Sequence, residues 1–88
     1  MPRLVITHDV VDIERWLKGK DERSAALGAI GADVTDFVAM DASNRVAVSA
    51  TIHDMAALQA LLDAPPPEVA VQMEAHGVVP PLTVYVEQ

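Results

Sequence analysis

Hydrophobic and polar residues alternate along this chain with two periods, one typical of strands and one typical of helices. The clearest strand pattern is RVAVSATI at residues 45–52, where every second residue from Val46 to Ile52 is apolar. Other stretches rich in β-forming residues predict strands at 3–8, 34–40 and 82–86. Apolar residues at helical spacing predict helices over 10–29 and 55–63, and a short helix that starts at Pro67 and ends before Gly77.

Two segments that lie 45 residues apart, 7–17 and 52–62, follow the same pattern. In each, a strand-like stretch ends in His-Asp, and apolar residues then occupy matching positions: Val10 and Met55, Ile13 and Leu58, Trp16 and Leu61, Leu17 and Leu62. A repeat of half the chain predicts two similar strand-helix-strand halves. The expected fold is a single α+β domain over 1–88, the ferredoxin-like split βαβ arrangement (β-α-β-β-α-β), with a four-stranded antiparallel sheet and helices on one face.

The predicted strands carry few charges on either side of the sheet. One side carries Val5, Phe37, Ala39, Ala47 and Tyr85, and the other carries Leu4, Ile6, Val38, Val48 and Val84. A sheet face that meets water usually alternates to polar residues, and an apolar patch of several hundred Å² is typical of an interface. We therefore expect a homodimer formed through the face without helices. The alternative is that β-propensity alone fills exposed positions with Val and Thr.

Charge and composition narrow the possible functions. Six basic and thirteen acidic residues give a net charge of −7, which argues against nucleic-acid and anionic-membrane partners. The chain has no cysteine, so disulfides, thiolate chemistry and cysteine-bound metals are excluded. We find no apolar run of membrane-spanning length and no signal-peptide pattern, and expect a cytoplasmic protein. Phosphate-binding and dinucleotide-binding motifs are also lacking, so no cofactor and no metal are expected.

The two His-Asp pairs, His8-Asp9 and His53-Asp54, resemble catalytic pairs. Neighbouring strand residues point to opposite faces, however, and both aspartates are better explained as helix N-caps, each preceded by a histidine at N′. The antiparallel geometry places His8 and His53 roughly 20 Å apart, which excludes a shared metal within one protomer. His76 ends the last predicted helix, where the helix dipole favours its protonated form. All three histidines are kept as weak catalytic candidates.

The first predicted helix has an interrupted apolar stripe. Lys20 and Arg23 stand between Trp16 and Leu27 on the side that should face the sheet, and a buried charge is costly. Either these side chains reach solvent, or the helix breaks at Gly19. Alternatively, helix and sheet separate here and leave a pocket walled by Trp16, with a cation for an anionic or carbonyl-bearing ligand.

Several segments together resemble a known superfamily. They are the first strand ending at His8, the segment 12–16, the entry Asn44-Arg45-Val46 to the third strand, and His76-Gly77-Val78 followed by Pro80-Pro81. In combination they resemble the dimeric α+β barrel superfamily, in particular small antibiotic-biosynthesis-monooxygenase-like and stress-response-like proteins. The resemblance implies a substrate cavity between helices and sheet, used by some members for cofactor-free oxygenation of polyphenols and by others for haem degradation. Haem is disfavoured, because the first strand lacks the asparagine of those members and the only Trp lies in the first helix.

Two functional hypotheses follow. The first is a small homodimeric module that binds a small organic ligand or a partner without chemistry of its own. The alternative is a cofactor-independent monooxygenase-like enzyme acting on a small aromatic or polyketide-like molecule. Trp16, Lys20, Arg23 and Tyr85 would then line the site, with a histidine as proton acceptor and a cation stabilising an enolate or phenolate.

Overall fold

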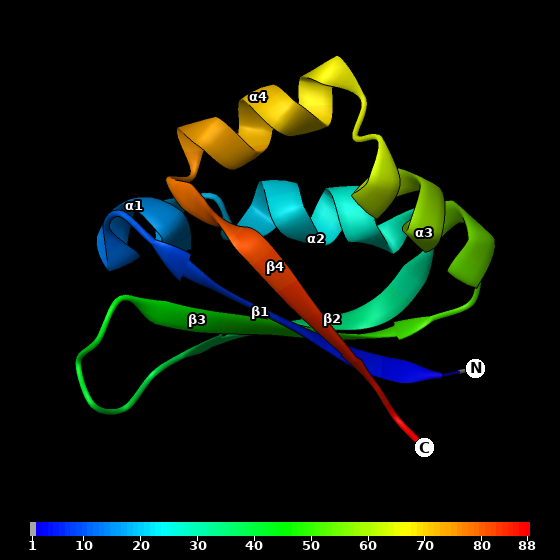
Figure 1. Ribbon diagram of the computed structural model, residues 1–88, viewed down its shortest axis with the longest axis horizontal. Helices are drawn as coiled ribbons and strands as arrows, with labels where there is room; N and C mark the ends of the chain where they lie inside the picture. The colour runs from blue at the N-terminus through cyan, green and yellow to red at the C-terminus, as the bar shows by residue number, and fades with distance from the viewer. Residues whose placement is uncertain (1) are drawn as a thin grey trace.

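A computed structural model describes residues 2–88 as one antiparallel sheet whose four strands carry all the helices on one face (Figure 1). The elements in chain order are β1 (Arg3–Val10), α1 (Ile13–Lys18), α2 (Lys20–Gly28), β2 (Gly31–Val38), β3 (Arg45–Ile52), α3 (Met55–Asp63), α4 (Pro67–Ala75) and β4 (Val78–Val86). The strand order is β2-β3-β1-β4. This is the predicted ferredoxin-like α+β fold; the helix expected over 10–29 is present as two shorter helices, α1 and α2, whereas α3 and α4 correspond to the two helices predicted in the second half.

Side-chain alternation divides the sheet into a buried and an open face. On the central strands, the buried residues facing the helices are Leu4, Ile6, His8, Val10, Val46, Val48, Ala50 and Ile52. On the open face, Val5 pairs with Tyr85 and Phe37 pairs with Ala47. Phe37 is 49% exposed and Tyr85 is 59% exposed. The open face therefore presents large apolar side chains to its surroundings.

The first strand extends two residues further than predicted. Asp9 pairs with Arg45 of β3 and with Val79 of β4, so ladder hydrogen bonds carry β1 through to Val10. The prediction that Asp9 caps the first helix is therefore wrong, and His8 is not an N′ residue. Asp12 caps α1 instead, and its side chain accepts a hydrogen bond from the Glu14 N–H at 3.0 Å.

In the second half, the cap lies where the repeat predicts it. The side chain of Asp54 accepts a hydrogen bond from the Ala57 N–H at 3.0 Å. The His-Asp repeat therefore marks a true strand-to-helix junction only in its second copy.

The first predicted helix breaks at Gly19, which ends α1 and precedes α2. The backbone dihedrals of Gly19 (φ −88°, ψ 7°) are accessible to any residue. A Cβ at this position would, however, overlap the imidazole of His76. Any larger residue at this position would have to displace the His76 ring.

The last strand begins earlier than predicted and carries a bulge beside His8. Thr7 pairs with Thr83 and Asp9 pairs with Val79, so β4 places two extra residues opposite the His8 position. Pro80 and Pro81 lie in this bulge, where the absence of an N–H costs no ladder hydrogen bond. The sheet is therefore locally open next to His8. Within residues 2–88, no helix is both long and apolar enough to cross a membrane.

Candidate functional site

A cavity of about 260 Å³ lies between the sheet and helices α2, α3 and α4. Its walls are mostly apolar and include Ile6, Val48, Leu58, Leu62, Val69 and Met73. Four polar side chains also line it: His8, Arg23, Gln72 and His76. Helix α4, which closes one side, has no fully buried residue of its own. The cavity is thus an apolar space with polar groups contributed by β1, α2 and the end of α4.

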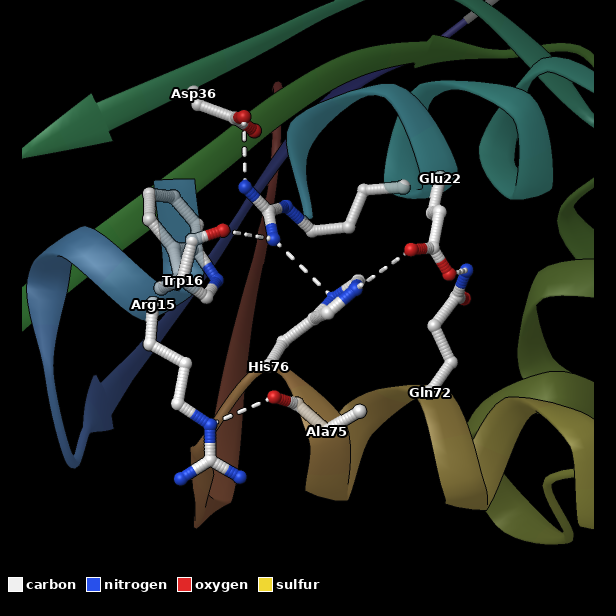
Figure 2. A network of polar contacts seen from close by, with 8 residues as sticks. Arg15, Trp16, Glu22, Asp36, Gln72, Ala75 and His76 are labelled. Carbon is white, nitrogen blue, oxygen red and sulfur yellow. Dashed lines mark hydrogen bonds and ion pairs between the residues drawn. The ribbon is translucent and has the colours of Figure 1, made fainter. Parts of the chain in front are cut away.

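Arg23 is the centre of a buried polar network with Trp16, Asp36 and His76, all three of which are labelled in Figure 2. Its Nη2 is 3.0 Å from Asp36 Oδ2, and the two side chains are only 11% and 4% exposed. Its Nη1 donates to the Trp16 carbonyl oxygen at 2.7 Å, and the guanidinium carbon lies 3.9 Å from the centre of the Trp16 ring. Stacking and hydrogen bonding together hold this cation away from solvent. Of the predicted alternatives, the helix break at Gly19 occurs, and Arg23 lies inside the protein instead of reaching solvent.

His76 follows α4 as its C-cap residue and is 5% exposed. Its Nδ1 is 3.3 Å from Arg23 Nη1, and its Nε2 is 3.8 Å from Glu22 Oε1, which is too long for a hydrogen bond. Burial, and secondly the Arg23 charge, lower the pKa of His76 below its ordinary value. The prediction that its protonated form is favoured is wrong here, because burial and the Arg23 charge act in the direction opposite to the helix dipole.

Three further hydrogen bonds hold α4 in place over the cavity. Arg15 Nε and Nη2 donate to the carbonyl oxygens of Ala75 and Glu74 at 2.7 and 2.8 Å. Gln72 Nε2 donates to Glu22 Oε2 at 3.2 Å (Figure 2). These contacts satisfy carbonyls at the C-terminal end of α4 and join α4 to α1 and α2.

His8 projects from β1 toward the helices. Its Nδ1 donates to the Asp9 carbonyl oxygen at 2.9 Å, and its ring meets the Trp16 ring edge-on with centroids 6.1 Å apart. Its Nε2 makes no hydrogen bond to any residue from 2 to 88. Because of the neighbouring bulge, His8 borders both the cavity and a shallow hollow on the open face beside Pro80 and Pro81. A second nitrogen is therefore left for a ligand.

The structure brings together some of the predicted site residues and separates others. His8, Arg23 and His76 line the cavity, and Trp16 is fully buried beneath Arg23 without lining it. The remaining three candidates lie elsewhere: Lys20 is exposed at the start of α2, Tyr85 is on the open face, and His53 is exposed after β3. His8 and His53 are at opposite ends of the paired strands β1 and β3, as the antiparallel register requires.

Sequence reasoning missed Asp36, Glu22 and Gln72. A signal for Asp36 exists, because it pairs with Val48, a residue of the buried face, and is thus a carboxylate at an inward position of a strand. The partner of Asp36 could not be read from local spacing, since Arg23 belongs to a different element. Among residues 2–88, no group of three or more metal-ligating side chains could hold a metal ion.

The positive charge of Arg23 at the polar end of the cavity is already paired. The Asp36 carboxylate lies against the Arg23 guanidinium, and Glu22 adds a second carboxylate that is 66% exposed beside His76. Arg23 therefore offers no free positive charge to a ligand. Of the anionic and carbonyl-bearing ligands considered for the predicted pocket, this pairing disfavours the anionic one.

Comparison of sequences and structures places this architecture among known proteins. The sequence matches no protein-family model and no curated protein. In structure, the chain is similar to a proposed antibiotic biosynthesis monooxygenase from Bordetella bronchiseptica (TM-score 0.70, 11% identity, 99% of this chain and 94% of that chain covered). It is also similar to protein Atu4242 from Agrobacterium tumefaciens (TM-score 0.65, 14% identity, 100% and 92% covered). A further antibiotic biosynthesis monooxygenase matches with a TM-score of 0.60 at 12% identity, with 100% and 97% covered. At such identities the likeness concerns the fold, so this chain has the ferredoxin-like α+β fold of antibiotic-biosynthesis-monooxygenase-like structures.

Proposed function

We propose that the protein binds a small, uncharged and mostly apolar organic molecule in the cavity between the sheet and helices α2, α3 and α4. The observation that carries this proposal is the combination of apolar walls with polar groups from His8, Arg23 and His76. Such a combination is typical of ligand sites, in which apolar walls supply affinity and a few polar groups fix orientation.

The size of the cavity limits the ligand. A dry cavity of about 150 Å³ accommodates benzene, so a volume of about 260 Å³ suits one or two fused rings. Ordinary ligand pockets begin at roughly 300 Å³. The cavity is below that range, which favours a binding module for a small molecule over an enzyme for a large polycyclic substrate.

Charge further limits the ligand. The Arg23 cation is already paired with Asp36, and the lowered pKa of His76 keeps that ring neutral near pH 7. An anionic ligand would lose its hydration without gaining an unpaired cation. A neutral molecule with a hydroxyl or carbonyl group fits this balance better.

The experiment is a thermal-shift and calorimetric comparison of 2-naphthol with 2-naphthoate at pH 7. At 100 times its dissociation constant a ligand adds about 2.7 kcal/mol of stability, which for a domain of this size raises Tm by roughly 10–20 °C. We expect 2-naphthol to bind and 2-naphthoate to bind at least tenfold more weakly. Val69→Trp, which fills the cavity from α4, should abolish binding, whereas Val71→Trp on the exposed side of the same helix should not. Equal binding by both variants would place the ligand elsewhere.

A second candidate function is cofactor-independent oxygenation of a small aromatic or polyketide-like molecule. It is supported by His8 Nε2, a proton acceptor in the same cavity as the Arg23 cation and without a hydrogen-bond partner among residues 2–88, and by the similarity in fold to antibiotic biosynthesis monooxygenase structures. The test is oxygen uptake with phenolic substrates in aerobic, metal-free buffer, with His8→Ala as the comparison. Binding of 2-naphthol without any oxygen uptake across a substrate panel would favour the binding module.

We also propose that the protein forms a homodimer through the open face of the sheet. Support comes from Phe37 and Tyr85, which are half-exposed on this face with Val5 and Ala47 as cross-strand neighbours. Large apolar side chains gathered on one face are typical of an interface. A second copy of the chain offers the same apolar surface, as a two-fold symmetric contact requires.

A further inference from the structure

The direction of the hydrogen bonds at the two cavity histidines is fixed by partners that can only donate or only accept. Arginine has donors and no acceptor. The 3.3 Å contact from Arg23 Nη1 therefore requires a lone pair on His76 Nδ1, and the proton of the neutral ring lies on Nε2. A backbone carbonyl only accepts. The 2.9 Å contact to the Asp9 carbonyl oxygen therefore places a proton on His8 Nδ1.

Arg23 can impose this tautomer because Arg23 itself is held in place. Its guanidinium is fixed by the Asp36 carboxylate, the Trp16 carbonyl and the Trp16 ring. On another side, the His76 ring lies so close to Gly19 that even a methyl group there would overlap it. A ring confined in this way has little freedom to flip and present its other nitrogen to Arg23.

We propose that Arg23 is a positioning residue that holds His76 as the Nε2–H tautomer, which leaves His8 as the cavity histidine with a free lone pair. His76 then cannot take a proton from a bound molecule through Nδ1, because Arg23 occupies that lone pair. Its Nε2–H is buried without a hydrogen-bond partner in residues 2–88, so His76 can only donate. Within the proposed ligand site, on which this consequence rests, the acceptor is His8 Nε2.

The charges that face His76 are consistent with a neutral ring. Arg23 and Glu22 of α2 and Arg15 of α1 are its charged neighbours. Burial and Arg23 lower the pKa of His76, and Glu22 opposes them with a smaller effect. The Arg15 charge acts in the same direction as Arg23, because a cation near the ring disfavours a second proton.

The test is ¹⁵N–¹H correlation spectroscopy of histidine ring nitrogens in ligand-free protein at pH 7, with the exposed His53 as internal reference. We expect His76 to show a protonated Nε2 and an unprotonated Nδ1, and His8 to show a protonated Nδ1. In the double variant Arg23→Met/Asp36→Leu, the pKa of His76 should rise and its tautomers should mix, while His8 stays unchanged. Arg23→Lys, which keeps a charged donor, should retain more of the Nε2–H form than the double variant.

Two results would overturn the proposal. One is a wild-type His76 that is protonated on Nδ1 or doubly protonated at pH 7. The other is a folded double variant in which the tautomer and pKa of His76 are unchanged. The measurement needs no ligand, so its outcome is separate from that of the naphthol binding experiment.

Discussion

Removing either partner of the buried Arg23–Asp36 pair should destabilise the protein strongly, whereas removing both should not. The pair is 3.0 Å long, with side chains that are 11% and 4% exposed. Breaking a buried pair on one side costs about 3–5 kcal/mol, because an uncompensated charge stays behind. A domain of 88 residues has a total stability of about 4–13 kcal/mol. Arg23→Met or Asp36→Leu alone should therefore remove a large fraction of the stability.

In the double variant two desolvated charges disappear together, and this gain opposes the loss of the Arg23 contacts with Trp16. Those contacts, a charged hydrogen bond and a cation–π stack, are worth about 2–4 kcal/mol. The Trp16 carbonyl keeps a partner, since it also accepts from the Gly19 N–H at 3.1 Å. We expect the double variant to lie within about 2 kcal/mol of the wild type, and so to be more stable than either single variant.

Urea denaturation of the four proteins at pH 7, followed by circular dichroism, measures this cycle. The coupling energy should amount to several kcal/mol. The exposed Arg45–Asp9 pair, 4.0 Å apart with side chains 79% and 64% exposed, is the control and should show little coupling. If the loss in free energy of unfolding of the double variant equals the sum of the losses of the two single variants, the idea that the two charges compensate each other in a desolvated site is refuted.

Three further predictions concern other parts of the structure. Because the pKa of His76 is lowered in the folded state, the unfolded chain takes up the additional proton at a higher pH than the folded chain. The stabilisation by neutral His76 is therefore complete above pH 6.5 and is lost as the pH falls from 6.5 through the lower folded-state pKa. Denaturation between pH 5 and 7 should show the free energy of unfolding decreasing as the pH decreases, and a His76→Gln variant with the same pH dependence would contradict this prediction. Gly19→Ala should cost about 1–3 kcal/mol by displacing the His76 ring, whereas Gly28→Ala, with nothing within 4 Å of the new methyl group, should be neutral or slightly stabilising in thermal unfolding. Phe37→Glu on the open face should shift the protein to monomers in light scattering, while Val71→Glu on α4 should leave the oligomeric state unchanged; a wild-type monomer at micromolar concentration would refute the dimer.

Local sequence signals were sufficient to predict the bounds of a strand or the cap of a helix where these depend on residues of that element alone. The alternation in 45–52 predicted β3 with its observed bounds, and Asp54 caps α3 as the sequence indicates. Local sequence signals gave the wrong structure where contacts with residues distant in the sequence determine it. Asp9 looks like an N-cap, but pairing with two neighbouring strands keeps it in β1.

The candidate site depends on such distant contacts even more. The polar residues in the stripe of the first helix predicted either a break or a pocket walled by Trp16. The break occurs at Gly19, and the cavity that is present is lined by Arg23 and not by Trp16. The glycine at the break lies against the ring of His76, which is 57 positions away in the sequence. Likewise, the choice of Arg23 over Lys20 as the inward cation is made by Asp36, because a carboxylate from β2 is available only to a side chain that faces the sheet. Periodicity can indicate an irregular helix, but the partner that stabilises it comes from tertiary packing.

The structure also extends the internal repeat beyond the His-Asp segments. At the 45-residue offset, Gly19 corresponds to Ala64, the C-cap of α3, and most of α2 corresponds to α4. Each half is therefore a strand, two helices and a strand, and Gly19 is the counterpart of the junction between α3 and α4. The polar contacts from Arg23 and Glu22 to His76 and Gln72 join the equivalent helices of the two halves. A cavity closed by contacts between α2 and α4 has a shape that depends on how the halves meet. Substitutions at Gly19 or His76 should therefore alter ligand binding more than substitutions of similar size within either half.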